Sequence, residues 1–491
     1  LKTKKIENYK GTYNYIYYSD IVEDTPVSFP VVGNRYAQVS DEYYRDIPGS
    51  PIAYWISSKT RDAFLSEESI GTVAPPKQGL ATADNERFLR LWHEVDIQKI
   101  GFGISSCDEA KTSGKKFFPY NKGGAFRRWY GNRDYVVNWE NDGYEIKNFK
   151  DDKGKVRSRP QNLQYYFKPA ITWSDVTSGS FSGRYAEQGF MFDIKGSSGF
   201  PDKELLPYVL GLLNSKVAQA FIKILNPTMT TQVGDMTRIP VIKADVDEIT
   251  LLSKECIDEA KADWDSFETS WDFKTHPLIR CGGKQNSYIK DAFESWALEC
   301  EQRFRNIKEN EEKLNQKFIE IYGLTGEISP EVNEKYITVS KADLERDIRS
   351  FISYSVGCMF GRYSLDVDGL VYAGGDWDAS KYASFAADKD NIIPICDDEY
   401  FEDDIVGLFV EFVKTVYGEE TLDENLKFIA DALGGKGQPK DVIRDYFLNG
   451  FYTDHCSKYS VTGSGKRPIY WLFNSGKKNG FKALIYMHRY Q

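Results

Sequence analysis

Histidine is scarce in this chain, which has only four among its 491 residues. The four lie far apart, and only one of them has a neighbouring cysteine, in the pair His455-Cys456. Because a structural zinc site needs four His or Cys ligands at short spacings, the sequence predicts no metal site. The seven cysteines are odd in number and include no Cys-x-x-Cys pair, which is typical of reduced intracellular thiols.

Long apolar runs are also missing. No stretch of 18 apolar residues occurs, and the start of the chain, Leu1 to Lys5, lacks the apolar core of a signal peptide. We therefore expect no membrane segment and a cytoplasmic location. The chain has no Gly-x-Ser-x-Gly motif, no Walker phosphate loop and no Ser-His-Asp order, so we assign no catalytic residue.

Positive charge is limited overall but is concentrated in one region. The net charge is -10, which argues against indiscriminate binding of nucleic acid. Residues 71–240 nevertheless hold 24 Lys and Arg against 18 Asp and Glu, and the part from Lys111 to Lys168 holds 14 against 6. The rest of the chain has 39 against 55. A local basic footprint on an acidic protein indicates a confined site for nucleic acid.

The stretch from Gly79 to Asn141 combines the residue types that bind phosphates and bases. Basic side chains, planar rings and paired glycines alternate in it, as in Asn121-Lys122-Gly123-Gly124-Ala125-Phe126-Arg127-Arg128-Trp129-Tyr130. A solvated surface over a few buried aromatic residues would give the same pattern. The residues alone leave both interpretations open.

Several phrases carry a family resemblance. They are Asn85-Glu86-Arg87-Phe88-Leu89-Arg90, Asn121-Lys122-Gly123-Gly124, Gly211-Leu212-Leu213-Asn214-Ser215-Lys216-Val217-Ala218, Phe351-Ile352-Ser353-Tyr354, Gly361-Arg362-Tyr363-Ser364-Leu365-Asp366 and the segment Trp471 to Arg489. Over nearly its whole length the chain resembles the target-recognition and C-terminal region of the PglX-type adenine-specific DNA methyltransferases of type 1 BREX phage-defence systems. More distantly, it is similar to fused restriction–modification methyltransferases.

The resemblance implies two motifs that this chain does not contain. An adenine methyltransferase of this kind holds S-adenosylmethionine on a glycine-rich loop and the flipped base on an Asn/Asp-Pro-Pro-Tyr/Phe tetrapeptide. The nearest strings are Asn226-Pro227-Thr228-Met229 and Ala373-Gly374-Gly375-Asp376, and neither is complete. We therefore expect a fragment without the catalytic domain, with no cofactor of its own. S-adenosylmethionine is expected only for the full-length parent.

The expected fold class is mixed α/β (α+β). Residues 1–65 would be a linker from the missing methyltransferase domain, and residues 66–243 a DNA target-recognition domain. Residues 244–330 would form a helical spacer, and residues 331–491 an acidic, helix-rich C-terminal domain. The Pro-Gly turn in Ile47-Pro48-Gly49-Ser50 resembles the junction between the first two parts.

Periodicity and turn residues predict the main elements. Strands are expected at 117–120, 135–139, 170–173 and 190–194, and as a C-terminal hairpin from 468–473 and 481–487 with its turn at 475–480. Helices are expected at 205–225, 244–262, 290–322, 342–361, 404–417, 423–433 and 440–448. Gly323 would end the long spacer helix.

The groups that hold the DNA backbone in position and the groups that read the base sequence should come from different side chains. Backbone phosphates would contact basic residues and the flexible glycine pair, namely Lys115, Lys116, Lys122, Gly123, Gly124, Arg127, Arg128, Arg133, Lys153, Lys155, Arg157 and Arg159. Base edges need planar hydrogen-bonding forks, for which the candidates are Asn121, Arg128, Asn132, Arg184 and Gln232. Each of these could instead be an ordinary surface residue. Trp129, Trp139 and Trp173 are expected in the core.

Three functions are compatible with these features. The preferred one is the DNA-recognition portion of a BREX adenine methyltransferase, with double-stranded DNA as partner. The basic segment 111–168 and Arg184 should then share one concave face in front of the helix at 205–225, with the acidic part after Lys341 standing apart. That face could also attract acidic phage proteins that imitate DNA. The alternative is a scaffold that binds other BREX proteins, which would suit the acidic remainder.

A third function, an independent metal-dependent enzyme, rests only on a group of acidic residues. These are Asp397, Asp398, Glu399, Glu402, Asp403 and Asp404. Carboxylates in such a group could hold a cation, as in a nuclease. They could equally form an acidic loop followed by a helix N-terminus, where carboxylates offset the helix dipole. We favour the second interpretation.

Overall fold

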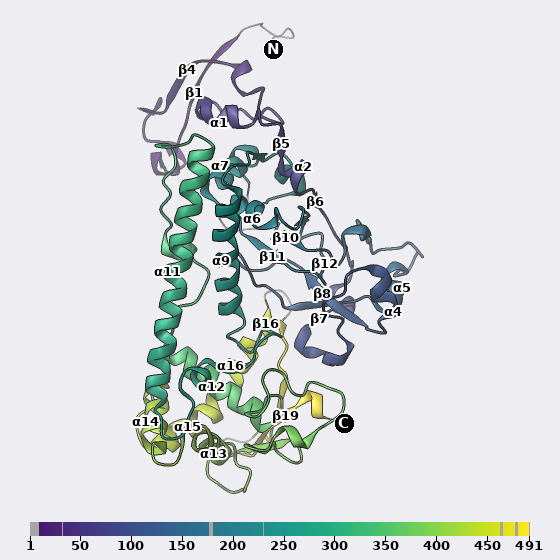
Figure 1. Ribbon diagram of the computed structural model, residues 1–491, viewed down its shortest axis with the longest axis vertical. Coiled ribbons are helices and arrows are strands. Elements are labelled where there is room, and N and C mark those ends of the chain that lie inside the picture. The colour runs from purple at the N-terminus through teal and green to yellow at the C-terminus, as the bar shows by residue number, and fades with distance from the viewer. Residues whose placement is uncertain are drawn as a thin grey trace.

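The computed structural model describes residues 9–31, 33–175, 180–228, 230–461, 465–476 and 480–490. Within them, sixteen α-helices occur with several small β-sheets, so the chain has the mixed α+β class that its sequence predicts. The long helix α11 (Ile289–Ile321) runs along one side of the molecule. The N-terminal strands lie near one end of α11 and the C-terminal helices near the other (Figure 1).

The N-terminal segment is a small antiparallel arrangement of strands. β1 (Lys10–Asn14) pairs with β4 (Arg35–Ser40), and β2 (Ile21–Val22) pairs with β3 (Thr25–Pro26). The Tyr13 ring stacks on the Tyr54 ring with 4.7 Å between centroids. α1 (Ser58–Ala63) then begins at Ser57, whose Oγ accepts a hydrogen bond from the Thr60 N–H.

Two four-stranded sheets lie at the centre of the chain. The first has the order β11 (Gly183–Ala186), β10 (Ala170–Trp173), β13 (Ser198–Gly199) and β6 (Pro76–Lys77), with antiparallel pairing throughout. The second has the order β12 (Met191–Phe192), β8 (Phe117–Asn121), β9 (Tyr135–Asn138) and β7 (Leu89–Leu91), in which only β12 and β8 are parallel. β8, β9, β10 and β12 confirm the four predicted strands.

Short elements connect these sheets and fill their edges. They are β5 (Glu68–Ser69), which pairs with β14 (Pro240–Val241), and the helices α2 (Ile70–Val73), α3 (Asn85–Phe88), α4 (Cys107–Thr112), α5 (Glu140–Lys147) and α8 (Val233–Met236). The rings of Trp129, Trp139 and Trp173 are buried, as predicted.

The helix predicted over 205–225 is two helices, which corrects the sequence analysis. α6 (Leu206–Asn214) and α7 (Lys216–Leu225) bend by 69° at Ser215. Ser215 has extended backbone angles, and its Oγ accepts a hydrogen bond from the Ala218 N–H at 3.2 Å, as at a helix N-terminus. Asn214 Oδ1 accepts from the Gly183 N–H at 2.8 Å, so α6 lies against β11, behind the first sheet as expected.

α6 and α7 form the most apolar part of the core. Every residue of α6 is buried, and the buried stripe continues in α7 through Val217 and Phe221. Among the described residues, no single helix has the length and apolar composition needed to cross a membrane. Only α6 and α7 taken together, as a bent pair, reach that length and composition.

Removing the cap at the bend should measurably weaken this core. In Ser215→Ala the Ala218 N–H loses its acceptor inside a buried region, and we expect the free energy of unfolding to fall by about 1 kcal/mol. Ser215→Thr keeps an accepting hydroxyl oxygen and should lose less. Urea denaturation followed by circular dichroism measures both. An unchanged midpoint for the alanine variant would contradict the capping role.

α11 joins two separate hydrophobic clusters. Its 33 residues span about 50 Å. Ile289 and Trp296, near its start, belong to the C-terminal cluster, whereas Ile307 and Phe318 belong to the cluster formed with α6, α7 and α9 (Val246–Trp264). The helix ends as predicted at Gly323, which has φ +67°. The long helix predicted over 290–322 is therefore confirmed, whereas its role as a spacer and the domain limits stay predictions.

The C-terminal part is mostly helical. Its helices are α10 (Pro277–Gly282), α12 (Leu344–Met359), α13 (Ile405–Tyr417), α14 (Leu422–Ala432), α15 (Pro439–Asn449) and α16 (Phe451–Lys458). Its three-stranded sheet has the order β15 (Ile392–Ile395), β19 (Lys482–Tyr486) and β18 (Tyr470–Asn474), and β16 (Ser460–Val461) pairs with β17 (Gly465–Lys466). The predicted helices and both hairpin strands are confirmed, but residues 477–479 of the hairpin turn lie outside the described residues.

The C-terminal part does not stand apart from the sheets, contrary to our expectation. His488 Nε2 lies 2.8 Å from the His93 carbonyl oxygen, and Arg467 forms an ion pair with Glu94 at 3.1 Å. Trp92 and Val95 also belong to a small apolar cluster that Leu370 contacts. Burial of this apolar surface stabilises the contact, whereas the expectation considered only the repulsion between the acidic part and DNA phosphates.

Candidate nucleic-acid interface

A glycine turn follows β8 and determines where Lys122 lies. Gly123 and Gly124 both have positive φ, +90° and +141°. A Cβ on Gly124 would lie 2.8 Å from Asn132 Nδ2, so this turn requires glycine. The half-buried Lys122 ammonium lies over the Tyr135 ring, 5.3 Å from its centroid, and burial lowers its pKa.

Two other loops meet this turn. The Asn121 carbonyl accepts from the Asp193 N–H at 2.9 Å, which brings Lys195 beside the glycine turn. The Asp175 N–H donates to the Lys195 carbonyl at 3.0 Å, and the Asp175 carbonyl accepts from the Thr231 N–H at 2.8 Å. Gln232 follows Thr231 directly. The structure thus brings Lys122, Gly123, Gly124 and Gln232 together with Lys195, an exposed cation that the sequence analysis missed.

Four of the predicted contact arginines are instead tied to the interior of the protein. Arg128 Nη1 lies 2.8 Å from Glu311 Oε2 on α11, and Arg127 Nη1 lies 3.3 Å from Asp263 Oδ2 on α9. Arg133 forms an ion pair with Glu187 and lies over the Tyr130 ring. Arg184 is 1% exposed, and burial lowers its pKa to about 10. Arg128, Arg133 and Arg184 are buried. The expectation that such arginines share one open face is therefore wrong for these three residues.

The remaining predicted residues near these arginines also have partners inside the protein. Lys115 Nζ donates to the Gln98 carbonyl at 2.5 Å, and Lys116 Nζ lies 3.1 Å from Glu140 Oε2. Asn121 is buried in β8, and Asn132 Nδ2 donates to the Ala125 carbonyl at 2.9 Å. A contact between these groups and DNA would have to replace or share these bonds. Their assignment as DNA contacts stays a prediction.

A concentration of exposed positive charge lies on a short hairpin, residues 149–159. Its five cations are all exposed, and within the described part of the chain none has an ion-pair partner or a side-chain hydrogen bond: Lys150, Lys153, Lys155, Arg157 and Arg159. The hairpin holds only two acidic residues, Asp151 and Asp152. We call residues 149–159 the basic hairpin.

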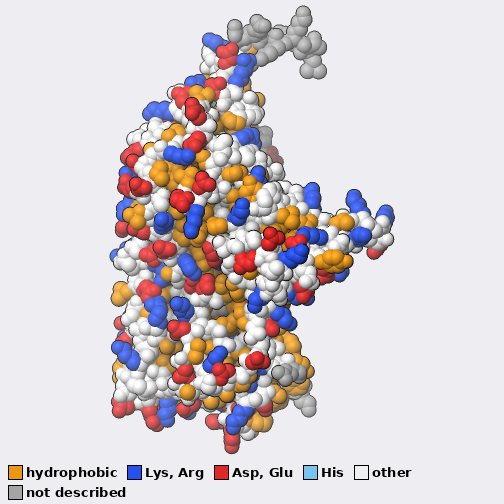
Figure 2. All heavy atoms as spheres, turned by 45° about the vertical axis from the view of Figure 1, so that its right-hand side comes forward, with side chains coloured by type: hydrophobic (Ala, Val, Ile, Leu, Met, Phe, Trp, Pro, Cys, Tyr) orange, Lys and Arg blue, Asp and Glu red, His pale blue; other side chains and the backbone are white. Residues whose placement is uncertain are grey.

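The backbone of the basic hairpin explains why its cations face solvent. Asp151 Oδ1 accepts from the N–H groups of Lys153 and Lys155 at 3.0 and 2.9 Å, which closes the turn around Gly154 at φ +78°. At the base, Arg159 pairs with Ala81 through two backbone hydrogen bonds. The region with α4 and α5 projects from the body of the molecule, and its tip carries Lys and Arg side chains (Figure 2).

A tyrosine between two lysines lies at the edge of the first sheet. Lys77 Nζ and Lys168 Nζ are each 5.5 Å from the centroid of the Tyr165 ring. Asn162 Nδ2 donates to the Gln78 carbonyl at 2.8 Å and holds the two segments together. The Tyr165 ring also packs against the Phe200 ring with 4.6 Å between their centroids, so its neighbours in the described chain account for its position. The sequence could not show this group of Tyr165 and two lysines, because Lys77 and Tyr165 are far apart in the chain.

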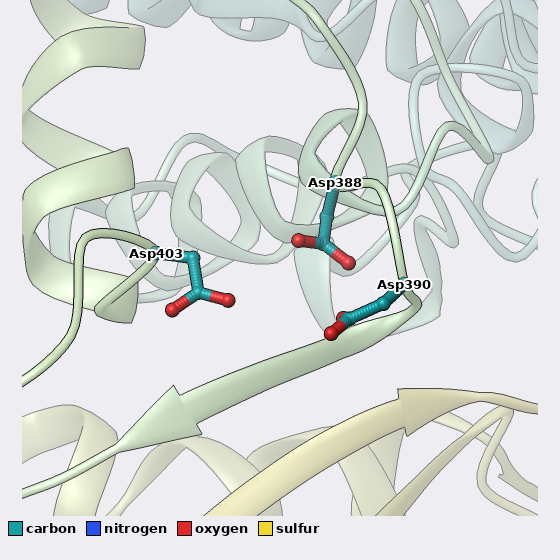
Figure 3. Close-up of side chains that lie close together, drawn as sticks. All are labelled: Asp388, Asp390 and Asp403. Atoms are coloured by element: carbon teal, nitrogen blue, oxygen red, sulfur yellow. The ribbon is translucent and has the colours of Figure 1, made fainter.

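Two of the acidic residues suggested as a metal site, Asp403 and Asp404, lie in different arrangements. Asp404 caps α13 and pairs with Arg444 at 2.9 Å, so it acts in the fold. Asp403 instead faces Asp388 and Asp390, with one oxygen of each within 4.8 Å of the others (Figure 3). Asp388 Oδ1 already accepts backbone N–H groups from Asn391 and Ile392. These bonds account for the loop without a cation.

No known protein-family model matches the chain. It is 43% identical, over its whole length, to the adenine-specific methyltransferase PglX of Lacticaseibacillus casei (strain Zhang). It is also 38% identical, over 91% of its length, to the adenine-specific methyltransferase BrxX of Escherichia coli O9:H4 (strain HS). The chain is PglX-like. It spans 41% and 38% of the length of these two relatives, so the activity of a whole PglX-like protein is a separate question.

The two strings nearest to the methyltransferase motifs have other roles in the fold. Asn226 Nδ2 is bonded to the Thr230 carbonyl and to Asp235, and its Oδ1 accepts from Thr228, so this side chain closes a turn after α7. Met229 lies outside the described residues. At the other candidate string, Gly375 faces Gln98, where a Cβ would come within 2.1 Å of Nε2. Neither string forms an open cradle for S-adenosylmethionine.

Proposed function

We propose that this chain is the DNA sequence-recognition portion of a BREX adenine-specific DNA methyltransferase. The observation that carries the proposal is the basic hairpin, with five exposed cations that have no partner in the described chain. Most of the other cations between 115 and 133 have partners inside the protein. Phosphate binding needs exposed cations without partners, because a cation held in a buried ion pair must lose that pair before it can bind DNA.

The division of labour follows from where the groups lie. The basic hairpin would contact the phosphate backbone and supply affinity without sequence preference. Exposed Gln232, beside Lys122 and Lys195, would approach a base edge. Its side-chain amide can donate one hydrogen bond to adenine N7 and accept another from the N6 amino group. For the whole protein we propose DNA as substrate and S-adenosylmethionine as methyl donor.

Neutralising the hairpin should weaken DNA binding at every sequence alike. In the triple variant Lys153→Ala, Lys155→Ala, Arg157→Ala, we expect the slope of log affinity against log salt to fall by up to about 2.7, from about 0.9 per lost phosphate contact. Fluorescence anisotropy of a labelled duplex between 50 and 200 mM salt, on the order of physiological ionic strength, measures the slope.

A matched control separates the hairpin from overall charge. The triple variant Lys254→Ala, Lys436→Ala, Lys440→Ala removes the same charge from exposed positions elsewhere. It should leave the slope nearly unchanged. Equal losses in both triple variants would mean that only net charge matters, and no loss in the first would remove the hairpin from the interface.

The alternative function, a scaffold for other BREX proteins, has one structural observation in its favour. Phe473 on the edge strand β18 is 55% exposed, and the exposed ring of Phe401 lies near that of Phe481. Exposed aromatic groups on a strand edge suit a protein contact. Weak DNA binding with little dependence on salt would favour this alternative.

A further inference from the structure

The basic hairpin carries one apolar side chain among its charged ones. From Lys150 to Arg157 every residue except Gly154 and Val156 is charged, and the Val156 side chain is 45% exposed. An apolar group in water is less stable than one covered by another apolar surface. The cations of the hairpin have a role in the proposed function, whereas Val156 has none.

Strand pairing places Val156 on a defined face of the hairpin. Lys150 and Val156 form an antiparallel bridge, and a backbone hydrogen bond of 2.9 Å joins the two strands on each side of this pair. The side chains of such a pair lie close together on one face of a two-stranded ribbon. Lys155 and Arg157 flank Val156 along the strand, so their side chains point to the opposite face.

Contacts at its base hold the hairpin to the body of the protein. The Phe149 ring lies 5.3 Å from the Phe88 ring, and the Ser158 hydroxyl donates to the Ile146 carbonyl. Beyond this base every residue from 152 to 157 is exposed, and so is Lys150. The hairpin is therefore a projecting two-stranded ribbon whose strands are already paired before any partner binds.

A ribbon of this kind fits the major groove of DNA, which is about 12 Å wide, and is too wide for the minor groove of about 6 Å. The apolar group that base edges present in the major groove is the 5-methyl group of thymine. We infer that the basic hairpin enters the major groove and that Val156 contacts this methyl group. The inference rests on the proposed function and adds a base contact to a hairpin whose cations hold phosphates.

The two faces of the ribbon then have different roles. Val156 faces the floor of the groove, where the base edges lie. Lys155 and Arg157 face away from the floor, and their long side chains reach phosphates at the rim. Val156 is in this way a specificity-determining residue for a position occupied by thymine.

Removal of the thymine methyl group tests the inference. Two labelled duplexes of alternating adenine and thymine are compared, one of which has deoxyuridine in place of every thymidine and so lacks only the 5-methyl groups. Fluorescence anisotropy with the whole chain should give about fourfold weaker binding to the deoxyuridine duplex, the effect of one methyl group that stays in water. The dependence of binding on salt should be the same for both duplexes, because their phosphates are identical.

Three single variants assign the preference for thymine to one side chain. Val156→Ala should bind both duplexes equally, and its salt slope should match that of the unmodified chain because all five cations of the hairpin remain. Val156→Ile keeps an apolar branched side chain and should keep the preference. Val367→Ala makes the same change at a valine of the C-terminal part that is 40% exposed, and it should also keep the preference.

The possible results separate this inference from the proposed function. Equal binding of the two duplexes by the unmodified chain, with a steep salt slope, would overturn the inference and leave the hairpin on phosphates alone. A preference for thymine that survives Val156→Ala would assign the methyl contact to another residue and overturn it as well. Absence of salt-dependent binding to either duplex would contradict the proposed function itself.

Discussion

Glu311→Ala is expected to lower the free energy of unfolding by about 3–5 kcal/mol. Glu311 accepts from Arg128 Nη1 at 2.8 Å and from Trp129 Nε1 at 2.7 Å, and the side chains of the charged pair are 4% and 8% exposed. The variant leaves a guanidinium and an indole N–H in the interior without an acceptor. An uncompensated buried charge is far more costly than a lost surface contact.

Two further variants define the cause of this loss. Glu309 lies on the exposed side of α11, and Glu309→Ala should change stability by less than about 0.5 kcal/mol. Removing both charges, in Arg128→Met with Glu311→Leu, should recover much of the loss because no lone charge remains. Urea denaturation gives all three values. A loss below about 1 kcal/mol in Glu311→Ala would show that water reaches the pair.

The same pair shows why the contact residues could not all be predicted from the sequence. Arg127 and Arg128 lie in a basic and aromatic stretch, which is equally typical of a DNA-binding surface and of a buried ion-pair network. The residue that decides between these two interpretations for Arg128 is its partner Glu311, which is 183 positions away on α11. Local composition reports charge and does not report burial. Arg157, in contrast, lies between turn residues and is exposed as its surroundings predict.

Helices could be predicted where a signal in the neighbouring residues, such as apolar spacing, a cap or a glycine, fixes their position. Spacing of apolar residues locates α9 and α11, Asp404 caps α13, and Gly323 ends α11 through a positive φ. The break at Ser215 was missed because apolar spacing continues across it, and only the hydroxyl marks a new N-terminus. Strands of two residues, such as β6 and β13, are too short to show alternation, and long-range pairing alone forms them.

The buried histidines should destabilise the protein as pH falls below about 6.5. His93, His276 and His455 are buried, and burial lowers the pKa of His93 and His276 to about 3 and that of His455 well below its usual value. In the unfolded chain each would titrate near 6.5. Below that pH the unfolded state binds protons that the folded state does not, so stability present above pH 6.5 is lost as pH falls.

Four carboxyl groups act in the opposite direction. Desolvation raises the pKa of Asp134 and Asp175 to about 6 and that of Asp193 and Asp388 above its usual value. Between pH 6 and pH 4 the folded state therefore binds protons more readily at Asp134 and Asp175 and gains stability. At pH 5 His93 and His276 would each cost about 2 kcal/mol, and Asp134 and Asp175 would each return about 1.4 kcal/mol. The two sets of groups therefore partly cancel between pH 7.5 and pH 5.

His276→Asn tests the histidine part of this balance. His276 Nδ1 accepts the Leu278 N–H at 3.3 Å at the start of α10, a position where asparagine can also accept a backbone N–H. The variant should keep the cap and remove one titrating group, so its stability should fall by about 2 kcal/mol less than that of the unmodified chain between pH 7.5 and pH 5. Urea denaturation at both pH values measures the difference. Identical pH dependence in the two proteins would mean that His276 is protonated in the folded state and that burial does not govern its charge.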